Sequence, residues 1–184
     1  MSDNTLTDND MGFTKLFTTF ESAKGEHAVF VGVLRSSGVY KPKPEIQAAK
    51  KAAKAKGEKF QHTAKTEGQG ITIAQIAAIN EFGSSDGKHP PSRPFMRLAI
   101  DKNRDKTNAL VVKLAKMIVD GKMTPLRALG LLGETVKGNM VKIINSGVSP
   151  VNKKSTIDRK GSSKPLIDTG QLKNSIDWEI VKGK

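Results

Sequence analysis

The sequence predicts a single α+β domain, spanning residues 1–184, in which a small antiparallel sheet packs against two long helices. Apolar residues recur at helical spacing through much of residues 71–145, whereas residues 28–34 and 176–180 have the composition of strands. A chain of 184 residues that is 36% apolar can also bury one modest core. The predicted fold further contains an N-terminal helix and extended basic loops.

The N-terminal helix is predicted from four apolar residues that recur at i, i+3, i+4 and i+7. They are Phe13, Leu16, Phe17 and Phe20. The polar segment before them, residues 1–10, is expected to be a disordered tail. The apolar stripe could pack into the core or dock on a neighbouring subunit, and the pattern leaves both open.

Residues 71–99 contain the signals of two helices joined by a stiff elbow. Thr72 and Gln75 can form a capping box at the start of the first helix, and Gly83 can end it in a left-handed conformation. The prolines at 90 and 91 favour an extended segment, because a residue that precedes proline is disfavoured in the helical region. Pro94 suits the first position of the second helix.

The second helix is expected to run from Pro94 to Gly121, with the polar residues 101–108 facing water. Thr124 followed by Pro125 then indicates the start of another long helix. Glycines at 130, 133 and 138 lie inside that helix, where each costs about 1 kcal/mol relative to alanine. They indicate either close contact with another helix or a local break.

Two segments have the pattern of strands. Residues 28–34 are apolar on both faces, which predicts burial under helices or against another subunit. Residues 176–180 alternate between apolar and acidic, and we expect them to pair with residues 28–34 and with one or two shorter strands. A helical turn capped by Asp168 or Thr169 and ending near Ser175 precedes this second strand.

Basic residues concentrate in two segments of a chain whose net charge is +13. Residues 41–70 form a lysine-rich arm or insertion, and residues 146–165 form a basic loop. Such a charge favours an anionic partner, most commonly nucleic acid, although lysines can also simply keep a surface soluble. The candidate residues that face DNA or a partner are Lys50, Lys51, Lys54, Lys56, Lys153, Lys154, Arg159 and Lys160.

No pattern in the sequence predicts catalysis, a cofactor or a metal site. The tripeptide Asp168-Thr169-Gly170 matches the active site of aspartic proteases, but the short stretch after it cannot supply the β-structure that such a fold requires. A helix cap explains these residues better. The three histidines lack the spacing of metal ligands. We therefore expect no enzyme.

Further classes are excluded by composition. The absence of cysteine excludes disulfides and fits assembly in a reducing cytoplasm. No apolar run reaches the 18 or so residues of a membrane span, so no membrane partner is expected.

Two blocks of the sequence resemble a family of tailed-phage tail components. The first is AINEFG at residues 78–83 followed by PSRPFMR at residues 91–97, and the second is LIDTGQLKNSI at residues 166–176. Both are similar to blocks in neck or tail-completion proteins of the head–tail joint, including the minor tail protein Z group. The lysine-rich run at residues 41–65 is not part of the family pattern.

The resemblance implies a structural virion protein, a head–tail connector that assembles in the host cytoplasm. Identical subunits would form a homo-oligomeric ring of roughly six or twelve copies and extend the DNA channel. Its partners would be the head-completion or portal-side proteins, the tail-side proteins and, non-specifically, the packaged DNA. The alternative is a stand-alone basic nucleic-acid-binding protein.

The elbow is the candidate interface of such a ring, because aromatic residues and arginine are favoured at the centres of interfaces. Alternatively, Phe95 packs into the core of its own subunit while the arginines bind nearby carbonyls or Glu81. In either arrangement Glu81 is the expected ionic partner of an arginine. The candidate interface residues are Glu81, Phe82, Arg93, Pro94, Phe95 and Arg97.

Overall fold

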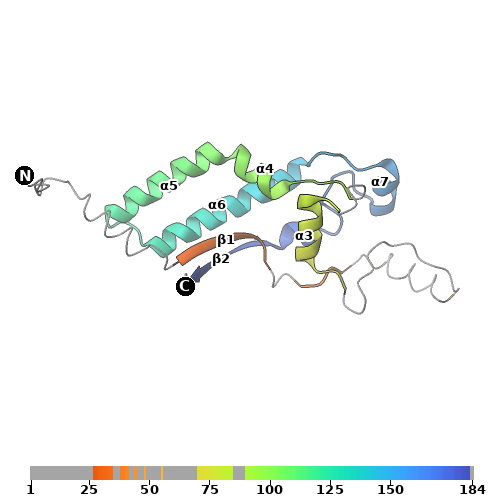
Figure 1. Cartoon of the computed structure of the whole chain (residues 1–184), viewed down its shortest axis with the longest axis horizontal. Coiled ribbons are helices and arrows are strands. Elements are labelled where there is room, and N and C mark those ends of the chain that lie inside the picture. The colour runs from red at the N-terminus through yellow and green to blue at the C-terminus, as the bar shows by residue number, and fades with distance from the viewer. Residues whose placement is uncertain are drawn as a thin grey trace, which may run out of the picture.

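The computed structural model describes residues 27–34, 38–41, 70–84 and 90–182, together with the single positions 44, 48 and 55. The expected tail at residues 1–10, the helix at residues 13–20 and most of the basic arm at residues 41–70 lie outside these residues. The described part is an α+β arrangement (Figure 1). Its elements are β1 His27–Val33, α3 Ile73–Phe82, α4 Phe95–Lys102, α5 Arg104–Val119, α6 Pro125–Ser146, α7 Lys154–Lys160, α8 Gln171–Asn174 and β2 Ile176–Lys182.

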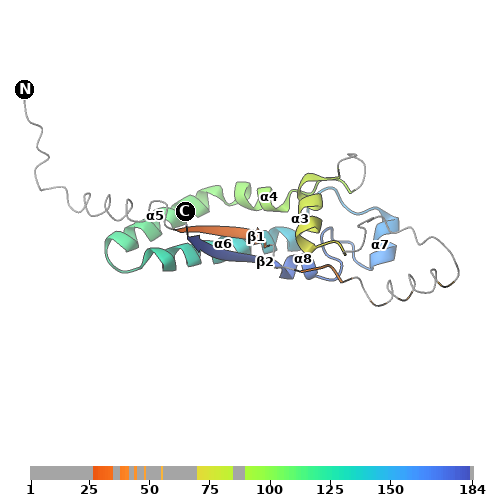
Figure 2. The ribbon, with the colours of Figure 1, turned by 60° about the horizontal axis from the view of Figure 1, so that its bottom comes forward.

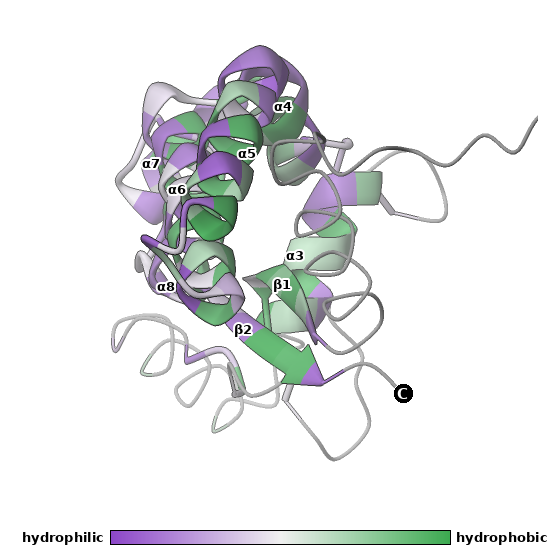
Figure 3. Cartoon of the chain, turned by 90° about the vertical axis from the view of Figure 1, so that its left-hand side faces the viewer, coloured by the Kyte–Doolittle hydropathy of each residue, from purple (hydrophilic) through white to green (hydrophobic). Residues whose placement is uncertain are grey.

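Helix α6 is the centre of the fold. The two-stranded sheet packs against it, and α4 and α5 pack along another side of it (Figures 1 and 2). The sheet therefore contacts mainly one long helix, where the sequence predicted two. The largest fully buried side chains come from α4, α6 and β2, namely Phe95, Ile144 and Ile176. In the end-on view of Figure 3, β1 and most of β2 are hydrophobic, whereas hydrophilic turns recur along the helices.

The sheet confirms the predicted strand pairing. β1 and β2 are antiparallel, with Val29 opposite Ile180 and Val31 opposite Trp178. Instead of the additional short strands, the described residues contain an isolated bridge between Val39 and Thr72. The described residues of the chain do not bury β1 on both faces, because Phe30 is 55% exposed on the outer face.

The predicted helix caps are confirmed at two places. The Thr72 hydroxyl accepts a 3.1 Å hydrogen bond from the Gln75 amide, and the Gln75 side chain accepts one of 2.9 Å from the Thr72 amide. Gly83 ends α3 at φ 85°. At the start of α6, the Thr124 hydroxyl accepts from the Arg127 amide at 3.3 Å, and proline occupies the first turn. These local hydrogen bonds fix where the helices begin, because each replaces a bond that a helix end lacks.

The predicted second helix is divided into α4 and α5. The break lies at Asn103, whose side-chain amide donates a 2.8 Å hydrogen bond to the Ala99 carbonyl. That carbonyl would otherwise accept the Asn103 backbone amide, which instead bonds Ile100 at 3.2 Å. The asparagine side chain thus competes with the backbone and interrupts the helix. The start of α4 also differs by one position, since Pro94 is its N-cap.

The glycines of α6 fit neither of the two predicted explanations. The helix continues through them, and the element that approaches it closely is a strand. A Cβ placed at Gly133 would lie 2.8 Å from Cγ and Cδ2 of Trp178, and one at Gly130 would lie 3.3 Å from Cη2 of the same ring. The indole therefore lies directly against the helix backbone, and nothing comparably close meets Gly138.

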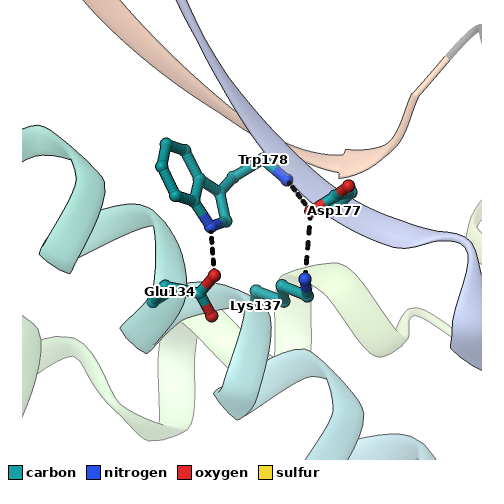
Figure 4. Close-up of polar contacts among 4 residues, drawn as sticks. All are labelled: Glu134, Lys137, Asp177 and Trp178. Carbon is teal, nitrogen blue, oxygen red and sulfur yellow. Dashed lines mark hydrogen bonds and ion pairs between the residues drawn. The ribbon is translucent and has the colours of Figure 1, made fainter.

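Polar contacts around this indole hold β2 on α6 (Figure 4). Trp178 Nε1 donates to Glu134 Oε1 at 2.7 Å, and Lys137 Nζ lies 3.0 Å from Asp177 Oδ1. Glu134 and Lys137 are three residues apart on α6 and therefore lie on the same side of the helix. Their partners, Trp178 and Asp177, are adjacent in β2, so the two contacts hold one short part of the strand against the helix.

The basic loop predicted at residues 146–165 contains the short helix α7. Gly161 ends that helix in the left-handed region, with φ 68°, which fits a glycine C-cap. The sequence prediction failed here because polar lysine and serine residues dominate the segment. None of the helices in the described ranges is long and apolar enough to cross a membrane.

Candidate functional site: the elbow and its pocket

The two sequence blocks at residues 78–97 and 166–176 pack against each other. Helix α3 contacts α8, and both blocks contribute to one hydrophobic cluster. The first block contributes Phe95 to this cluster, and the second contributes Leu172 and Ile176. Ala77, the residue that precedes the first block, also belongs to the cluster. Segments that are distant in the chain therefore form one structural unit at one end of the molecule (Figure 2).

Glu81 connects the end of α3 with the beginning of α4. Its side chain is only 4% exposed, and its two carboxylate oxygens accept hydrogen bonds of 3.0 Å from the backbone amides of Met96 and Arg97. A carboxylate is stabilised there because the amides of a helix N-terminus carry partial positive charge. Glu81 was expected to pair with an arginine side chain, but its partners among the described residues are these two backbone amides.

Arg93 is also buried within the fold, with 8% of its surface exposed. Its Nε donates to the Pro150 carbonyl at 2.8 Å, and Nη2 lies 3.4 Å from Asn152 Oδ1. Burial lowers the pKa of this guanidinium from its usual value. Among the described residues no carboxylate pairs with it, and both of these hydrogen-bond acceptors are neutral.

The remaining elbow residues divide between the interior and the surface. Phe95 is completely buried in the core of the chain's own fold, and Pro94 is partly buried. Phe82, by contrast, is 70% exposed, and Arg97 is exposed as well. Three of the predicted interface residues, Glu81, Arg93 and Phe95, therefore make contacts inside the chain. For Phe95 and Arg93 this is the alternative stated above, in which the ring packs into the core and the arginine binds a nearby carbonyl.

A pocket of about 310 Å³ lies where α3, α7 and α8 meet. Tyr40 donates a 2.8 Å hydrogen bond to Asp168 Oδ2 at its wall. Burial, together with this carboxylate, raises the pKa of Tyr40 to about 12. The polar lining includes Tyr40, Asn80, Arg93, Thr156, Lys160 and Asp168.

The Asp168-Thr169-Gly170 turn is only partly as predicted. Gly170, at φ 78°, is the N-cap of α8, and the Thr169 hydroxyl accepts a long bond of 3.4 Å from the Gln171 amide. Asp168 binds Tyr40 instead of capping the helix. Sequence reasoning missed this pair because 128 positions separate the two residues, and no local signal connects them.

The predicted basic residues lie in different environments. Lys153 and Lys154 are exposed at the start of α7, and Lys160 Nζ donates to the Lys164 carbonyl at 2.7 Å. The Arg159 side chain and Lys50, Lys51, Lys54 and Lys56 lie outside the described residues.

A further basic row, absent from the sequence prediction, follows the exposed side of α5 at Lys106, Lys113 and Lys116. Their spacing places them on one helix face, and this spacing was the signal that could have revealed them.

Over the residues that the structure describes, no cluster of acidic, histidine or cysteine side chains could hold a metal ion. The pocket instead combines a buried guanidinium, a phenol–carboxylate pair and an apolar floor, a set of groups that suits binding of a polar ligand. Comparisons of the chain with protein-family models, curated proteins and solved structures gave no match.

Proposed function

We propose that this chain is a structural subunit of a tailed bacteriophage, a neck or tail-completion protein that forms a ring at the head–tail joint and extends the DNA channel. The observation that carries the proposal is the joining of the two blocks that resemble this family. They lie apart in the sequence but share one hydrophobic cluster and one pocket. The two blocks therefore belong to one structural unit.

The contact between subunits uses the exposed part of the elbow. Phe82 presents an apolar ring that is 70% exposed, and the neighbouring Arg97 is held by its backbone bond to Glu81 while its side chain is exposed. Aromatic and arginine side chains are favoured anchors of interfaces. The buried residues Glu81, Arg93 and Phe95 make the elbow rigid, which lowers the ordering cost of association.

Electron microscopy of the purified full chain, alone and with extracts of phage heads and tails, tests this function. Rings of one size, or incorporation at the joint, are expected. Phe82→Asp should abolish both by placing a charge in the contact, whereas Val112→Asp, at an equally exposed site on α5, should not. A monodisperse monomer that never enters particles contradicts the proposal.

The net charge of +13 and the lysine row of α5 favour a second candidate, a stand-alone nucleic-acid-binding protein. The two functions differ in their response to salt. Binding through phosphates weakens steeply as salt rises, whereas a ring held by apolar contacts does not. Binding of a DNA duplex and formation of rings should both be measured from about 50 to 200 mM salt. The two responses to salt distinguish the nucleic-acid-binding function from the connector function.

A further inference from the structure

The pocket contains a buried positive charge that lacks a negative partner among the described residues. Arg93 is 8% exposed and hydrogen-bonds to a carbonyl and an amide oxygen. An arginine remains protonated in proteins, and a buried charge without a counter-charge is costly. Since this guanidinium lines a pocket of about 310 Å³, an anionic group that enters the pocket would remove that cost.

The surroundings of the pocket are also basic. Lys160 contributes to the lining, and the exposed Lys153 and Lys154 lie at the start of α7, between the lining residues Asn152 and Thr156 in the sequence. Asp168 is the acidic residue of the lining, and Tyr40 donates to it. The size is at the lower end of the range of about 300–1,000 Å³ that is typical of ligand pockets, enough for a short stretch of peptide.

The chain itself contains a segment of the opposite charge. Residues 1–10 include Asp3, Asp8 and Asp10 and have no lysine or arginine, although the whole chain has a net charge of +13. This segment precedes β1, which begins at His27. Charge complementarity therefore exists between the chain's first residues and the pocket.

The first residue of β1 and the pocket lie toward opposite ends of the fold. His27 pairs with Lys182, at the end of β2 that is remote from α8, whereas α8 lines the pocket. Helix α6, with 22 residues, spans roughly 33 Å between these ends. In a head-to-tail ring, the end of one subunit where β1 begins can therefore face the pocket end of the next.

We propose that the acidic segment at residues 1–10 of one subunit binds in the Arg93 pocket of the neighbouring subunit. One of its aspartates forms an ion pair with the Arg93 guanidinium and the others lie near the lysines of α7. The inference rests on the proposed function, because it requires a head-to-tail assembly. It adds a second contact to that of Phe82, and each subunit then both gives and receives a segment.

Disulfide trapping in the full chain tests the exchange, since the sequence contains no cysteine. In the variant Asn9→Cys/Thr156→Cys, mild oxidation should produce a ladder of covalently linked multimers. The control Asn9→Cys/Val112→Cys places the second thiol on exposed α5 and should produce no ladder. A bond formed only within single subunits, or no bond at all, contradicts the proposal.

A peptide-binding assay tests the charge requirement. The ligand is a peptide of residues 1–10, and the receptor is the full chain with the substitutions Asp3→Asn, Asp8→Asn and Asp10→Asn. Fluorescence anisotropy should show that the acidic peptide binds at least about tenfold more tightly than its all-asparagine counterpart. Thr156→Glu in the receptor should remove that preference by repulsion, while Thr156→Gln should preserve it. Equal affinity for both peptides contradicts the proposal.

The two proposals can fail separately. Rings seen by electron microscopy without the covalent ladder would contradict the segment exchange and leave the connector function in place. Absence of rings, alone and on particles, would contradict the function itself.

Discussion

Two phenylalanines of the elbow have opposite environments, although both belong to the same sequence block. Phe95 is completely buried among α3, α4 and α6, whereas Phe82 is 70% exposed at the end of α3. The difference arises because Phe95 lies on the side of α4 that faces the core, while Phe82 is the last residue before the turn at Gly83. The first residue therefore contributes to stability and the second is available for association.

Substitution of each phenylalanine by alanine should separate these roles. Phe82→Ala should change the free energy of unfolding by no more than about 0.5 kcal/mol, as is usual for exposed sites. Phe95→Ala should cost about 3–5 kcal/mol because it removes a buried ring and leaves a cavity. Urea unfolding followed by the fluorescence of Trp178 measures both. A large loss of stability in Phe82→Ala would contradict its role as a surface anchor.

Tyr40 supplies a prediction about pH. Its pKa is raised from 10.0 to about 12 in the folded chain, mainly by burial and also by its bond to Asp168. The unfolded chain releases this proton near pH 10, so the folded state binds more protons between pH 10 and 12. The stabilisation is complete below pH 10 and is lost as the pH rises toward 12.

The matched comparison is Tyr40→Phe, which retains the ring and removes the titrating hydroxyl. Between pH 10 and 12 the wild-type free energy of unfolding should fall more steeply than that of the variant, in urea titrations at each pH. At neutral pH the variant should lose about 1 kcal/mol through the missing hydrogen bond. Parallel pH profiles for the two proteins would contradict the assignment.

Among the elements, the helix starts were predicted from a few neighbouring residues, namely the capping box at Thr72 and the Thr124-Pro125 start of α6. The pairing of β1 with β2 was also predicted, because the composition of each segment marked it as a strand although the two lie far apart in the chain. The break at Asn103 was missed even though it is local, because it depends on which acceptor the asparagine side chain binds, and that acceptor is the Ala99 carbonyl. The pocket was not predictable either, since it depends on Tyr40 meeting Asp168 across the fold.

The contact of β2 with α6 explains why Gly130 and Gly133 lie inside that helix, a point that the sequence pattern did not decide. Substitution by alanine tests the explanation. Gly133→Ala should destabilise the protein by about 1–3 kcal/mol, because the added methyl group would lie 2.8 Å from a rigid indole. That cost exceeds the gain in helix propensity of about 1 kcal/mol. Trp178 fluorescence should shift as the ring moves.

Gly138→Ala is the matched control in the same helix. A Cβ there has no atom within 4 Å, so only the propensity gain remains and stability should rise by up to about 1 kcal/mol. Equal effects of the two substitutions in urea unfolding would show that the indole does not press on the helix.

At the scale of the whole molecule, the difference between the two ends of the fold is the feature that matters most. The elbow and pocket lie at one end, while β1 begins and β2 finishes toward the other (Figures 1 and 2). The proposed ring requires a head-to-tail contact between two different surfaces of neighbouring copies, and such contacts close into rings when the rotation allows. The charge of +13 would then be repeated around the ring, which suits a channel that carries DNA.

The measurement that tests the connector function most directly is the distribution of particle masses of the purified full chain and its Phe82→Asp variant, with class averages of the same samples. In the presence of phage heads or tails, the wild-type chain should form closed rings of a single copy number, and the variant should remain monomeric. Wild-type chain that stays monomeric and off the particles under every condition, or a variant that forms the same rings, would contradict the account.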